Sequence, residues 1–552
     1  MKWLALQPAD RIRLILALVA GLCCAAAFPK ISLAGLGWLA PGLMLASTFG
    51  ASPGGIFRLG YVAGLVHYLA SLYWLLFIPV SFAPVLGWVA LSAYCALYPA
   101  LWVWLCWKLY PGGAPRSEPG RQKGLIELAE HFLAARWSRR LHWALLCAAL
   151  WVAAEMIRSR FLTGFPWNPL GASQYRILPV IQVASFTGVY GVSFLMVWTS
   201  VSLLGAALLT LRRPEQRNPW LVELFLPVIV VIATVSFGMR QLFSKPVAGP
   251  SAKLALIQPS IPQTMIWNPA DSAERFQQLI ALSEQALTNR PDVLIWPEAA
   301  VPNLLRWDTN IFQSVVELVR RHNVWLILGA DDAERARNDA ERVNYFNSSF
   351  LITPAGEIAA SYRKRKLVIF GEYVPLQRWL PFLKYLTPIQ GGFTPGPGPV
   401  SFVLGNPRVK TSVLICFEDI FPHVARDYAE PDTDFLLNLT NNGWFGESAA
   451  QWQHAAMAVF RAVENGLPLV RCANNGLTCW IDSQGRLHEI HFPGSDNIYQ
   501  AGFKLADVPI LGGRHRPLTL FAKQGDWFGW LCVALATIRV VWRLATRRVT
   551  RG

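Results

Sequence analysis

Three side chains that could carry chemistry stand at strand ends in the second half of the chain: Glu298, Lys364 and Cys416. Cys416 ends the apolar run that begins at Thr411, Glu298 follows an apolar run that ends in Trp-Pro, and Lys364 follows a third strand-like segment. Open α/β sheets place their functional side chains at the carboxyl ends of strands. A thiol, a carboxylate and an ammonium are the groups that covalent acyl transfer requires, so the pattern indicates a site for that chemistry.

Each of these residues also has a plain structural explanation. A single glutamate after a strand is usually solvated, and Lys364 is one of four cations in the basic run 363–366. A single cysteine is more often a buried thiol than a nucleophile. The interpretation therefore depends on the combination of the three residues and on the segments around them.

The composition of the chain indicates a membrane protein. Of its 552 residues, 53% are hydrophobic and only 15% are charged, whereas about a quarter of a soluble domain is charged. The 24 tryptophans fit this class, because indole rings favour the headgroup interface. Much of the net charge of +16 lies in short loops beside apolar runs, where Lys and Arg set topology, so we do not expect a nucleic-acid partner.

Eight apolar stretches come close to the roughly 20 residues needed to cross about 30 Å of hydrocarbon. They cover about 11–28, 31–49, 57–78, 85–107, 141–158, 190–211, 220–240 and 525–543. The first two are short and are separated by Phe28-Pro-Lys30, which favours a tight helical hairpin. Residues 1–27 could instead form a signal peptide, and either interpretation leaves the rest of the chain in the same orientation.

Clusters of Lys and Arg predict the orientation of these spans. With eight spans threaded alternately, the clusters before the first span and after the second, fourth, sixth and eighth fall on one face. Arg158, Arg160 and Arg176, after the fifth span, are the exception. Because the richer face is normally cytoplasmic, residues 245–520 are expected on the outer side of the membrane.

Residues 245–520 have a different pattern, in which short apolar runs alternate with segments of helical periodicity. The expected helices cover 271–288, 309–322 and 449–465. This alternation predicts an α/β domain. We therefore expect a transmembrane bundle over 1–244, an α/β domain over 245–520, and a C-terminal transmembrane helix with a cytoplasmic tail over 521–552.

The cysteines and histidines predict neither a disulfide framework nor a metal site. Six of the nine cysteines lie in apolar stretches, and Cys472 and Cys479 could form a disulfide, although two buried thiols are the expected state. His454 has no second histidine at ligand spacing, which favours a structural, hydrogen-bonded histidine. With no glycine-rich phosphate loop either, we expect no metal and no cofactor.

The segments around the three reactive residues resemble the nitrilase superfamily, whose members use a Glu–Lys–Cys triad. Trp296-Pro-Glu298, a segment from Tyr362 to Tyr373 that contains Lys364, and Cys416-Phe-Glu418 follow the order of the family, with separations of 66 and 52 residues. The segments Asn441–Gly446, Gln453-His454 and Arg471–Gly476 narrow the resemblance. With the apolar spans, the whole chain is similar to the apolipoprotein N-acyltransferase family. This resemblance implies an α-β-β-α sandwich for residues 245–520.

The resemblance implies a role for each matching residue. Cys416 would be the nucleophile and Glu298 the general base, while Lys364 would stabilise the oxyanion together with the backbone N–H after Cys416. Glu372 and Glu418 would orient Lys364 and the nucleophile. The other matching positions are Phe417 beside the nucleophile and, for substrate binding or support of the site, Trp267, Asn347, Trp444 and Phe445. The sequence departs from the family at two positions. Phe417 stands where the family often has Tyr after the cysteine, and Ile369 stands where Pro commonly precedes Phe-Gly-Glu.

The resemblance further implies a two-step reaction that completes lipoprotein maturation. A fatty acyl chain would pass from a phospholipid, at sn-1 of phosphatidylethanolamine, to the cysteine thiol and then to the N-terminal amine of an S-diacylglyceryl-cysteine apolipoprotein. The protein would lie in the bacterial inner membrane, with the α/β domain on the periplasmic side. Apolar loops at 380–396 and 443–452 would dip toward the headgroups and control lipid access; the oligomeric state stays open.

Two other functions fit parts of the sequence. A membrane-tethered amidase or nitrilase acting on a small amide would share the triad but would not need eight spans. A transporter or receptor whose outer domain only binds a ligand would need the spans but leaves the Glu–Lys–Cys order unexplained. The acyltransferase accounts for both features.

Overall fold

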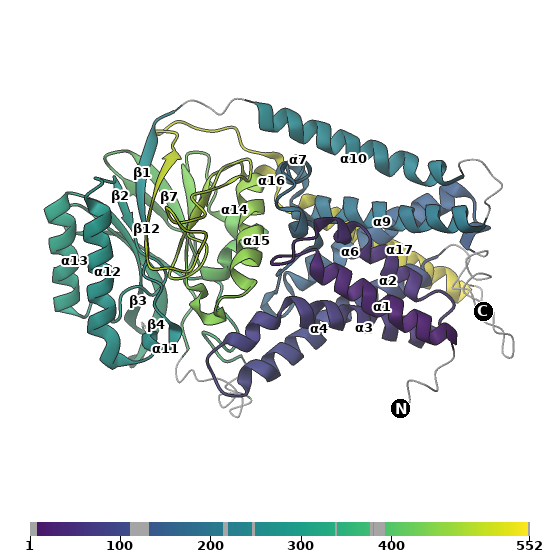
Figure 1. Ribbon diagram of the computed structural model, residues 1–552, viewed down its shortest axis with the longest axis horizontal. Coiled ribbons are helices and arrows are strands. Elements are labelled where there is room, and N and C mark those ends of the chain that lie inside the picture. The colour runs from purple at the N-terminus through teal and green to yellow at the C-terminus, as the bar shows by residue number, and fades with distance from the viewer. Residues whose placement is uncertain are drawn as a thin grey trace. The chain divides into compact units, whose positions relative to one another are not determined.

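The computed structural model describes residues 8–110, 132–212, 219–244, 249–336, 339–375, 379 and 392–549 (Figure 1). The chain forms two compact units. The first contains Met1–Tyr73, Leu86–Ser244 and Asp526–Gly552, and the second contains Trp74–Val85 and Lys245–Gly525.

The first unit is helical. Within the described ranges, five helices are long and apolar enough to cross a membrane. They are α4 (Ala83–Lys108), α6 (Trp137–Arg158), α9 (Val189–Arg212), α10 (Pro219–Phe243) and α17 (Trp527–Val549). These helices coincide with five of the eight expected spans.

The other three expected spans lie at the N-terminal end of the same unit. α1 (Pro8–Ala26) and α3 (Pro53–Ser71) have 19 residues each, which corresponds to about 28 Å of helix. Residues 31–49, in contrast, form no continuous helix but the short η2 (Ala34–Trp38) and the eight-residue α2 (Ala40–Ser47). Pro41 in the first turn of α2 marks this break, since proline lacks the N–H that would continue a preceding helix.

Two of the three arginines that follow the fifth expected span have partners inside the helical unit. Arg158 is 2% exposed, and its Nη1 donates a hydrogen bond to the carbonyl of Trp167 at 2.7 Å. Arg160 forms an ion pair with Asp526. Because these two arginines bind other parts of the same unit, their position after the fifth span is no guide to the cytoplasmic side.

The second unit contains two six-stranded sheets. The first has the order β12-β1-β2-β3-β4-β5, with β12 (Gly502–Pro509), β1 (Ser251–Gln258), β2 (Val293–Ile295), β3 (Trp325–Ala336), β4 (Asp339–Ile352) and β5 (Ile358–Arg363). The second has the order β11-β10-β9-β8-β7-β6, with β11 (Leu487–His488), β10 (Cys479–Ile481), β9 (Leu469–Ala473), β8 (Phe435–Thr440), β7 (Val409–Ile415) and β6 (Ser401–Leu404).

Each sheet has three parallel strands at its centre, β1-β2-β3 in one and β7-β8-β9 in the other. All residues of β2, β8 and β9 are buried, as expected for strands covered on both faces. Parallel strands also bring their carboxyl ends to the same edge of a sheet, so the turns after β2 and β7 lie where functional side chains are normally found.

Helices cover the outer faces of the two sheets (Figure 1). α12 (Ser272–Leu287) and α13 (Thr309–His322) pack with the first sheet around a core that includes Trp296 and Leu318. α14 (Pro422–Asp427) and α15 (Ala450–Asn465) lie on the side of the second sheet. The three helices expected from periodicity are thus confirmed as α12, α13 and α15, within an α-β-β-α arrangement.

Candidate active site

Cys416 lies at the turn between β7 and the short helix η8 (Cys416–Ile420). Its φ is +54°, a conformation that costs a non-glycine residue about 1–3 kcal/mol and persists only where the surroundings enforce it. Two hydrogen bonds hold the turn: the N–H of Ile415 donates to Glu418 Oε2 at 2.8 Å, and Asn438 Nδ2 donates to the carbonyl of Cys416 at 2.8 Å. The strained turn therefore fixes the direction of the thiol.

Glu298 lies in the turn after β2 and is 7% exposed. Its Oε1 accepts a hydrogen bond from Asn347 Nδ2 at 2.8 Å, and its Oε2 accepts one from the backbone N–H of Asn441 at 2.9 Å. The turn packs closely on β3, because a Cβ at Gly329 would lie 2.4 Å from the carbonyl oxygen of Pro297 and 2.7 Å from the Cα of Glu298. Gly329 is therefore required for this carboxylate to reach its place.

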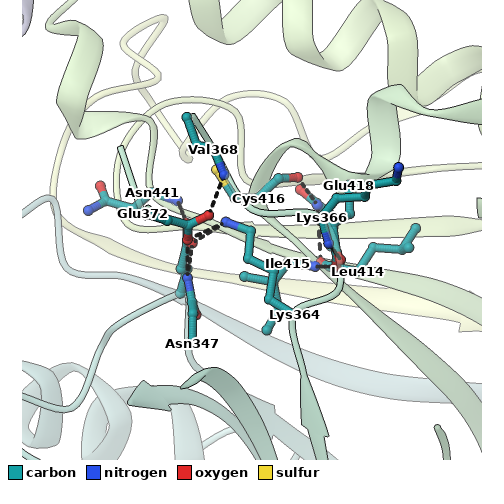
Figure 2. A network of polar contacts seen from close by, with 12 residues as sticks. Asn347, Lys364, Lys366, Val368, Glu372, Leu414, Ile415, Cys416, Glu418 and Asn441 are labelled. Carbon is teal, nitrogen blue, oxygen red and sulfur yellow. Dashed lines mark hydrogen bonds and ion pairs between the residues drawn. The ribbon is translucent and has the colours of Figure 1, made fainter. Parts of the chain in front are cut away.

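Lys364 follows β5 directly and is 1% exposed. Its Nζ lies 2.8 Å from Glu372 Oε1 and 3.3 Å from Glu298 Oε1. Asn347 Nδ2 donates to the same Oε1 atom of Glu372 at 2.9 Å, so one ammonium and one amide bind two carboxylates. Figure 2 shows Lys364, Glu372 and Asn347 joined in this network, with Cys416 nearby.

The carboxylates of the site raise the pKa of both Lys364 and Cys416, which favours the charged ammonium but disfavours the thiolate. Burial lowers the pKa of Lys364, but the carboxylates of Glu372 and Glu298 outweigh it and raise that pKa well above its usual value. Burial raises the pKa of the Cys416 thiol, the charge of Glu298 adds to this effect, and Lys364 opposes it. The Cys416 side chain is therefore a neutral thiol at rest, and it would need a base to remove its proton before it could act as a nucleophile.

Glu418 connects the segment after Lys364 to the turn at Cys416 and is fully buried. Its Oε1 accepts hydrogen bonds from the backbone N–H groups of Arg365 at 2.7 Å and Lys366 at 3.0 Å. Its Oε2 accepts one hydrogen bond from the backbone N–H of Ile415 and one from the Tyr362 hydroxyl, both at 2.8 Å. Burial raises the pKa of Glu418, and the backbone N–H groups of Lys366 and Ile415 oppose this. Glu418 therefore ties the segment after Lys364 to the turn at Cys416 through hydrogen bonds.

The remaining expected residues are placed less uniformly. The Phe417 ring lies under the ammonium of Lys364, 5.5 Å from Nζ to the ring centroid. Trp267 and Trp444 form an edge-to-face pair with centroids 5.1 Å apart, and Phe445 packs on Trp74 at 4.6 Å. The structure thus brings Glu298, Lys364, Cys416, Glu372 and Asn347 together. Trp267, Trp444 and Phe445, in contrast, form their ring contacts with other aromatic side chains.

Several features of the site were not foreseen from the residue types. The backbone N–H of Asn441 binds Glu298, and the Tyr362 hydroxyl lies 2.6 Å from that of Tyr428 while binding Glu418. A backbone donor leaves no trace in residue type, so only the fold can reveal it. For the contact of Tyr362 with Glu418, the sequence offered one signal, namely that Tyr362 lies two residues before Lys364.

His454, Cys472 and Cys479 are buried side chains of the α/β domain. His454 is buried, with Nε2 2.5 Å from Asp419 Oδ1 and Nδ1 3.2 Å from Asn442 Oδ1, as expected of a structural histidine. Cys472 and Cys479 are both buried free thiols. In the described ranges no group of three His, Cys, Asp or Glu residues could hold a metal ion. Phe382, Leu383, Tyr385 and Leu386, expected in a lipid-access loop, lie outside the described residues.

Two family models match the chain. The model of the carbon-nitrogen hydrolases matches residues 253–507, and that of the apolipoprotein N-acyltransferase N-terminal domain matches residues 20–202. An amidase of the nitrilase superfamily from Nesterenkonia AN1 shows a low structural similarity, with a TM-score of 0.35 and 17% identity over 48% of this chain and 92% of that chain. The fold and the first model define a carbon-nitrogen hydrolase domain attached to an apolar helical region.

Curated relatives narrow this class. An apolipoprotein N-acyltransferase of Geobacter metallireducens is 34% identical over 542 residues, which cover 97% of this chain and 95% of the relative. Another, from Bradyrhizobium diazoefficiens, is 35% identical over 425 residues, or 75% of each chain. The chain belongs to the apolipoprotein N-acyltransferase family.

Proposed function

We propose that this protein transfers a fatty acyl chain from a membrane phospholipid to the N-terminal amine of a diacylated apolipoprotein through a thioester on Cys416. The observation that carries the proposal is the buried cluster in which Lys364 Nζ binds Glu372 and Glu298 beside the Cys416 turn, in a chain of this family. Glu298, Lys364 and Cys416 are the proposed catalytic residues, with Glu372, Glu418 and Phe417 as their supports.

In the first half-reaction Cys416 attacks the ester carbonyl of a phospholipid. Glu298 accepts the thiol proton while sulfur bonds to the carbonyl carbon, and Lys364 stabilises the oxyanion with the backbone N–H that follows the cysteine. The carbon–oxygen bond of the ester then breaks, and Glu298 returns the proton to the departing alkoxide. The products are an acyl-cysteine thioester and a lysophospholipid.

In the second half-reaction the amine of the apolipoprotein attacks the thioester. Nitrogen bonds to the acyl carbon, Glu298 accepts a proton from nitrogen, and the carbon–sulfur bond breaks. The proton then passes to sulfur, which restores the thiol. Two substrates that react in succession at one cysteine give ping-pong kinetics.

Lipid substrates also explain why the α/β domain is attached to an apolar helical region. Extracting an acyl chain from the bilayer costs about 0.8 kcal/mol per CH₂, so a site attached to the membrane avoids a large penalty. A small-amide hydrolase has no such need, and the N-terminal region matches the N-terminal domain of the acyltransferases, which disfavours the amidase alternative. We take sn-1 of phosphatidylethanolamine as the donor position.

The topology of the chain is part of the same proposal. We propose a bundle over 1–244, the α/β domain over 245–520 and a final helix with tail over 521–552, with Trp74–Val85 packing on the α/β domain. α1, the broken segment formed by η2 and α2, and α3 add three crossings to the five long helices, which gives eight. The Lys and Arg bias then puts the α/β domain on the periplasmic side of the bacterial inner membrane.

Intact-mass spectrometry after incubation with phosphatidylethanolamine tests the function directly. We expect one fatty-acyl adduct, localised to the Cys416 peptide, because the thioester accumulates when no amine is present. Addition of an S-diacylglyceryl-cysteine lipopeptide should discharge the adduct and give an N-acylated lipopeptide. A protein that forms no adduct, or forms one that the lipopeptide leaves intact, would contradict the proposal.

The aromatic residues near the site should control access of lipid to it. Trp267 is 41% exposed and contacts Trp444, so the pair presents apolar surface. We expect Trp267→Ser with Trp444→Ser to slow thioester formation from phospholipid vesicles about tenfold or more, a loss equivalent to about 1.4 kcal/mol or more. Thioester formation from a water-soluble short-chain ester should change little. Trp307→Ser, at a tryptophan that is 63% exposed, is the control and should leave both rates unchanged.

A further inference from the structure

Asp331 projects toward the candidate active site from β3. Its Cα partner across the antiparallel β3–β4 pair is Asn347, so the two side chains leave the same face of the sheet as neighbours. Gly329 lies two residues earlier on the same face, where β3 packs against the turn that carries Glu298. Asp331 therefore stands beside the residues that bind Lys364, although no motif drew attention to it.

The carboxylate of Asp331 differs from its neighbour in having no internal partner. Asp332, on the opposite face, is buried and binds Arg363 at 3.0 Å and Arg306 at 3.8 Å. Asp331 is half-buried, and within the described part of the chain it has neither a hydrogen bond nor an ion pair. A half-buried carboxylate with no donor from the described residues is open to a donor from a ligand or from solvent.

A second acceptor beside Asp331 is also unused. Asn347 is 6% exposed, and its Nδ2 donates to both Glu298 and Glu372. Since two carboxylate oxygens require donors, this arrangement fixes which end of the amide is nitrogen, and Oδ1 is left buried without a hydrogen-bond donor. The neighbouring side chains of Asp331 and Asn347 thus offer at least two acceptors and lack a donor.

The charges around these acceptors favour a cation. The groups that interact electrostatically with Asp331 are Glu298, Glu372 and Lys364, so three carboxyl groups share one ammonium. Burial, with smaller contributions from the charges of Glu298 and Glu372, raises the pKa of Asp331 to about 7, although the charge of Lys364 opposes them. A ligand with one positive charge and several N–H donors would satisfy both the charge and the open acceptors.

We propose that Asp331 and the side-chain oxygen of Asn347 form a subsite for a primary ammonium group of a substrate. This inference rests on the proposed function, which supplies two such groups: the α-ammonium of the apolipoprotein and the headgroup of phosphatidylethanolamine. An α-ammonium bound there would pass one proton to the Asp331 carboxylate and become the neutral amine that attacks the thioester. The carboxyl group would later lose that proton to water. The amide product carries no charge at nitrogen, so it would lose the ion pair and leave.

The substitution Asp331→Asn, assayed in the full-length protein by half-reactions, distinguishes the two sources. If the apolipoprotein amine binds there, thioester formation from phosphatidylethanolamine and from phosphatidylglycerol should stay within about twofold of wild type, while KM for a diacylated lipopeptide rises about tenfold or more. If the headgroup binds there, thioester formation should fall for phosphatidylethanolamine alone. Equal losses with both donors and an unchanged lipopeptide KM would overturn the subsite, as would no effect at all.

The pH profile separates a binding role from a structural one. In the wild type, kcat/KM for the lipopeptide should peak between about pH 7, above which Asp331 is ionised, and about pH 8, below which an α-amine is protonated. In Asp331→Asn only the free amine can bind, so kcat/KM should rise through about pH 8 to a plateau. A headgroup subsite leaves this profile unchanged, so a bell-shaped profile retained by a variant with normal donor rates would overturn the proposal.

Two further variants control for folding and charge. Asp331→Glu keeps the charge and should retain most lipopeptide affinity. Glu334→Gln removes one negative charge from the opposite face of the same strand, where Glu334 binds Arg363 at 2.6 Å, and should leave the lipopeptide KM unchanged. Absence of a Cys416 thioester in the wild type would refute the proposed function itself, whereas a normal thioester with an unaffected Asp331→Asn variant would refute only the subsite.

Discussion

The variant Cys416→Ser is expected to form no acyl adduct under conditions in which the wild type is fully acylated, and to lose acyl transfer by about 10³-fold or more. A hydroxyl is a far weaker nucleophile than sulfur, and the ester it would form is less reactive toward an amine than a thioester. The backbone at Cys416 has a φ of +54°, and serine, which differs from cysteine by one atom, can adopt the same conformation, so the turn should be unchanged. Intact mass and the rate of lipopeptide acylation measure the two effects.

Cys472→Ser provides a matched control for this experiment. Cys472 is also a buried thiol of the α/β domain, and it donates weakly to the carbonyls of Ile257 and Ile295 at 3.3 and 3.4 Å. The same change of sulfur to oxygen should leave the acyl adduct and the transfer rate close to wild type. An adduct that persists in Cys416→Ser but is lost in Cys472→Ser would transfer the role of nucleophile to Cys472.

The substitution Lys364→Met should reduce both activity and stability. Loss of an oxyanion-stabilising group costs about 10²–10³-fold in rate. Because Lys364 is the ammonium between Glu298 and Glu372, its removal also leaves two buried carboxylates without their cation, and breaking a buried ion pair in this way costs about 3–5 kcal/mol. Thioester formation measured by mass, and thermal unfolding followed by tryptophan fluorescence, should both show the loss.

A double variant separates these two consequences. Lys364→Met with Glu372→Gln removes one of the unmatched charges and should recover part of the lost thermal stability, while the thioester still fails to form at the wild-type rate. Equal unfolding temperatures for the single and double variants would show that the carboxylates do not depend on Lys364 for their stability. Recovery of activity in the double variant would exclude Lys364 from the chemistry.

Much of the local structure followed from patterns that depend on near neighbours in the chain. The spacing of apolar residues predicts a helix over 309–322, and α13 covers the same residues, with Asp308 Oδ1 capping its start and Asn323 ending it in the left-handed conformation. The apolar runs before Glu298 and Cys416 predict the strands that end there. Residues 31–49 were the exception: mean apolarity suggested one span, but Pro41 divides the segment into η2 and α2.

The sequence by itself determined the family, the alternation of strands and helices, and the residues from which an acyl-transfer site could be assembled. Those properties are carried by residue types and short spacings. Only the tertiary structure decided that Asn347 joins Glu298 to Glu372, that the N–H of Asn441 binds Glu298, and that Asp331 and Asn347 are cross-strand neighbours. These contacts arise from strand register and from turns on different strands, whose partners lie far apart along the chain.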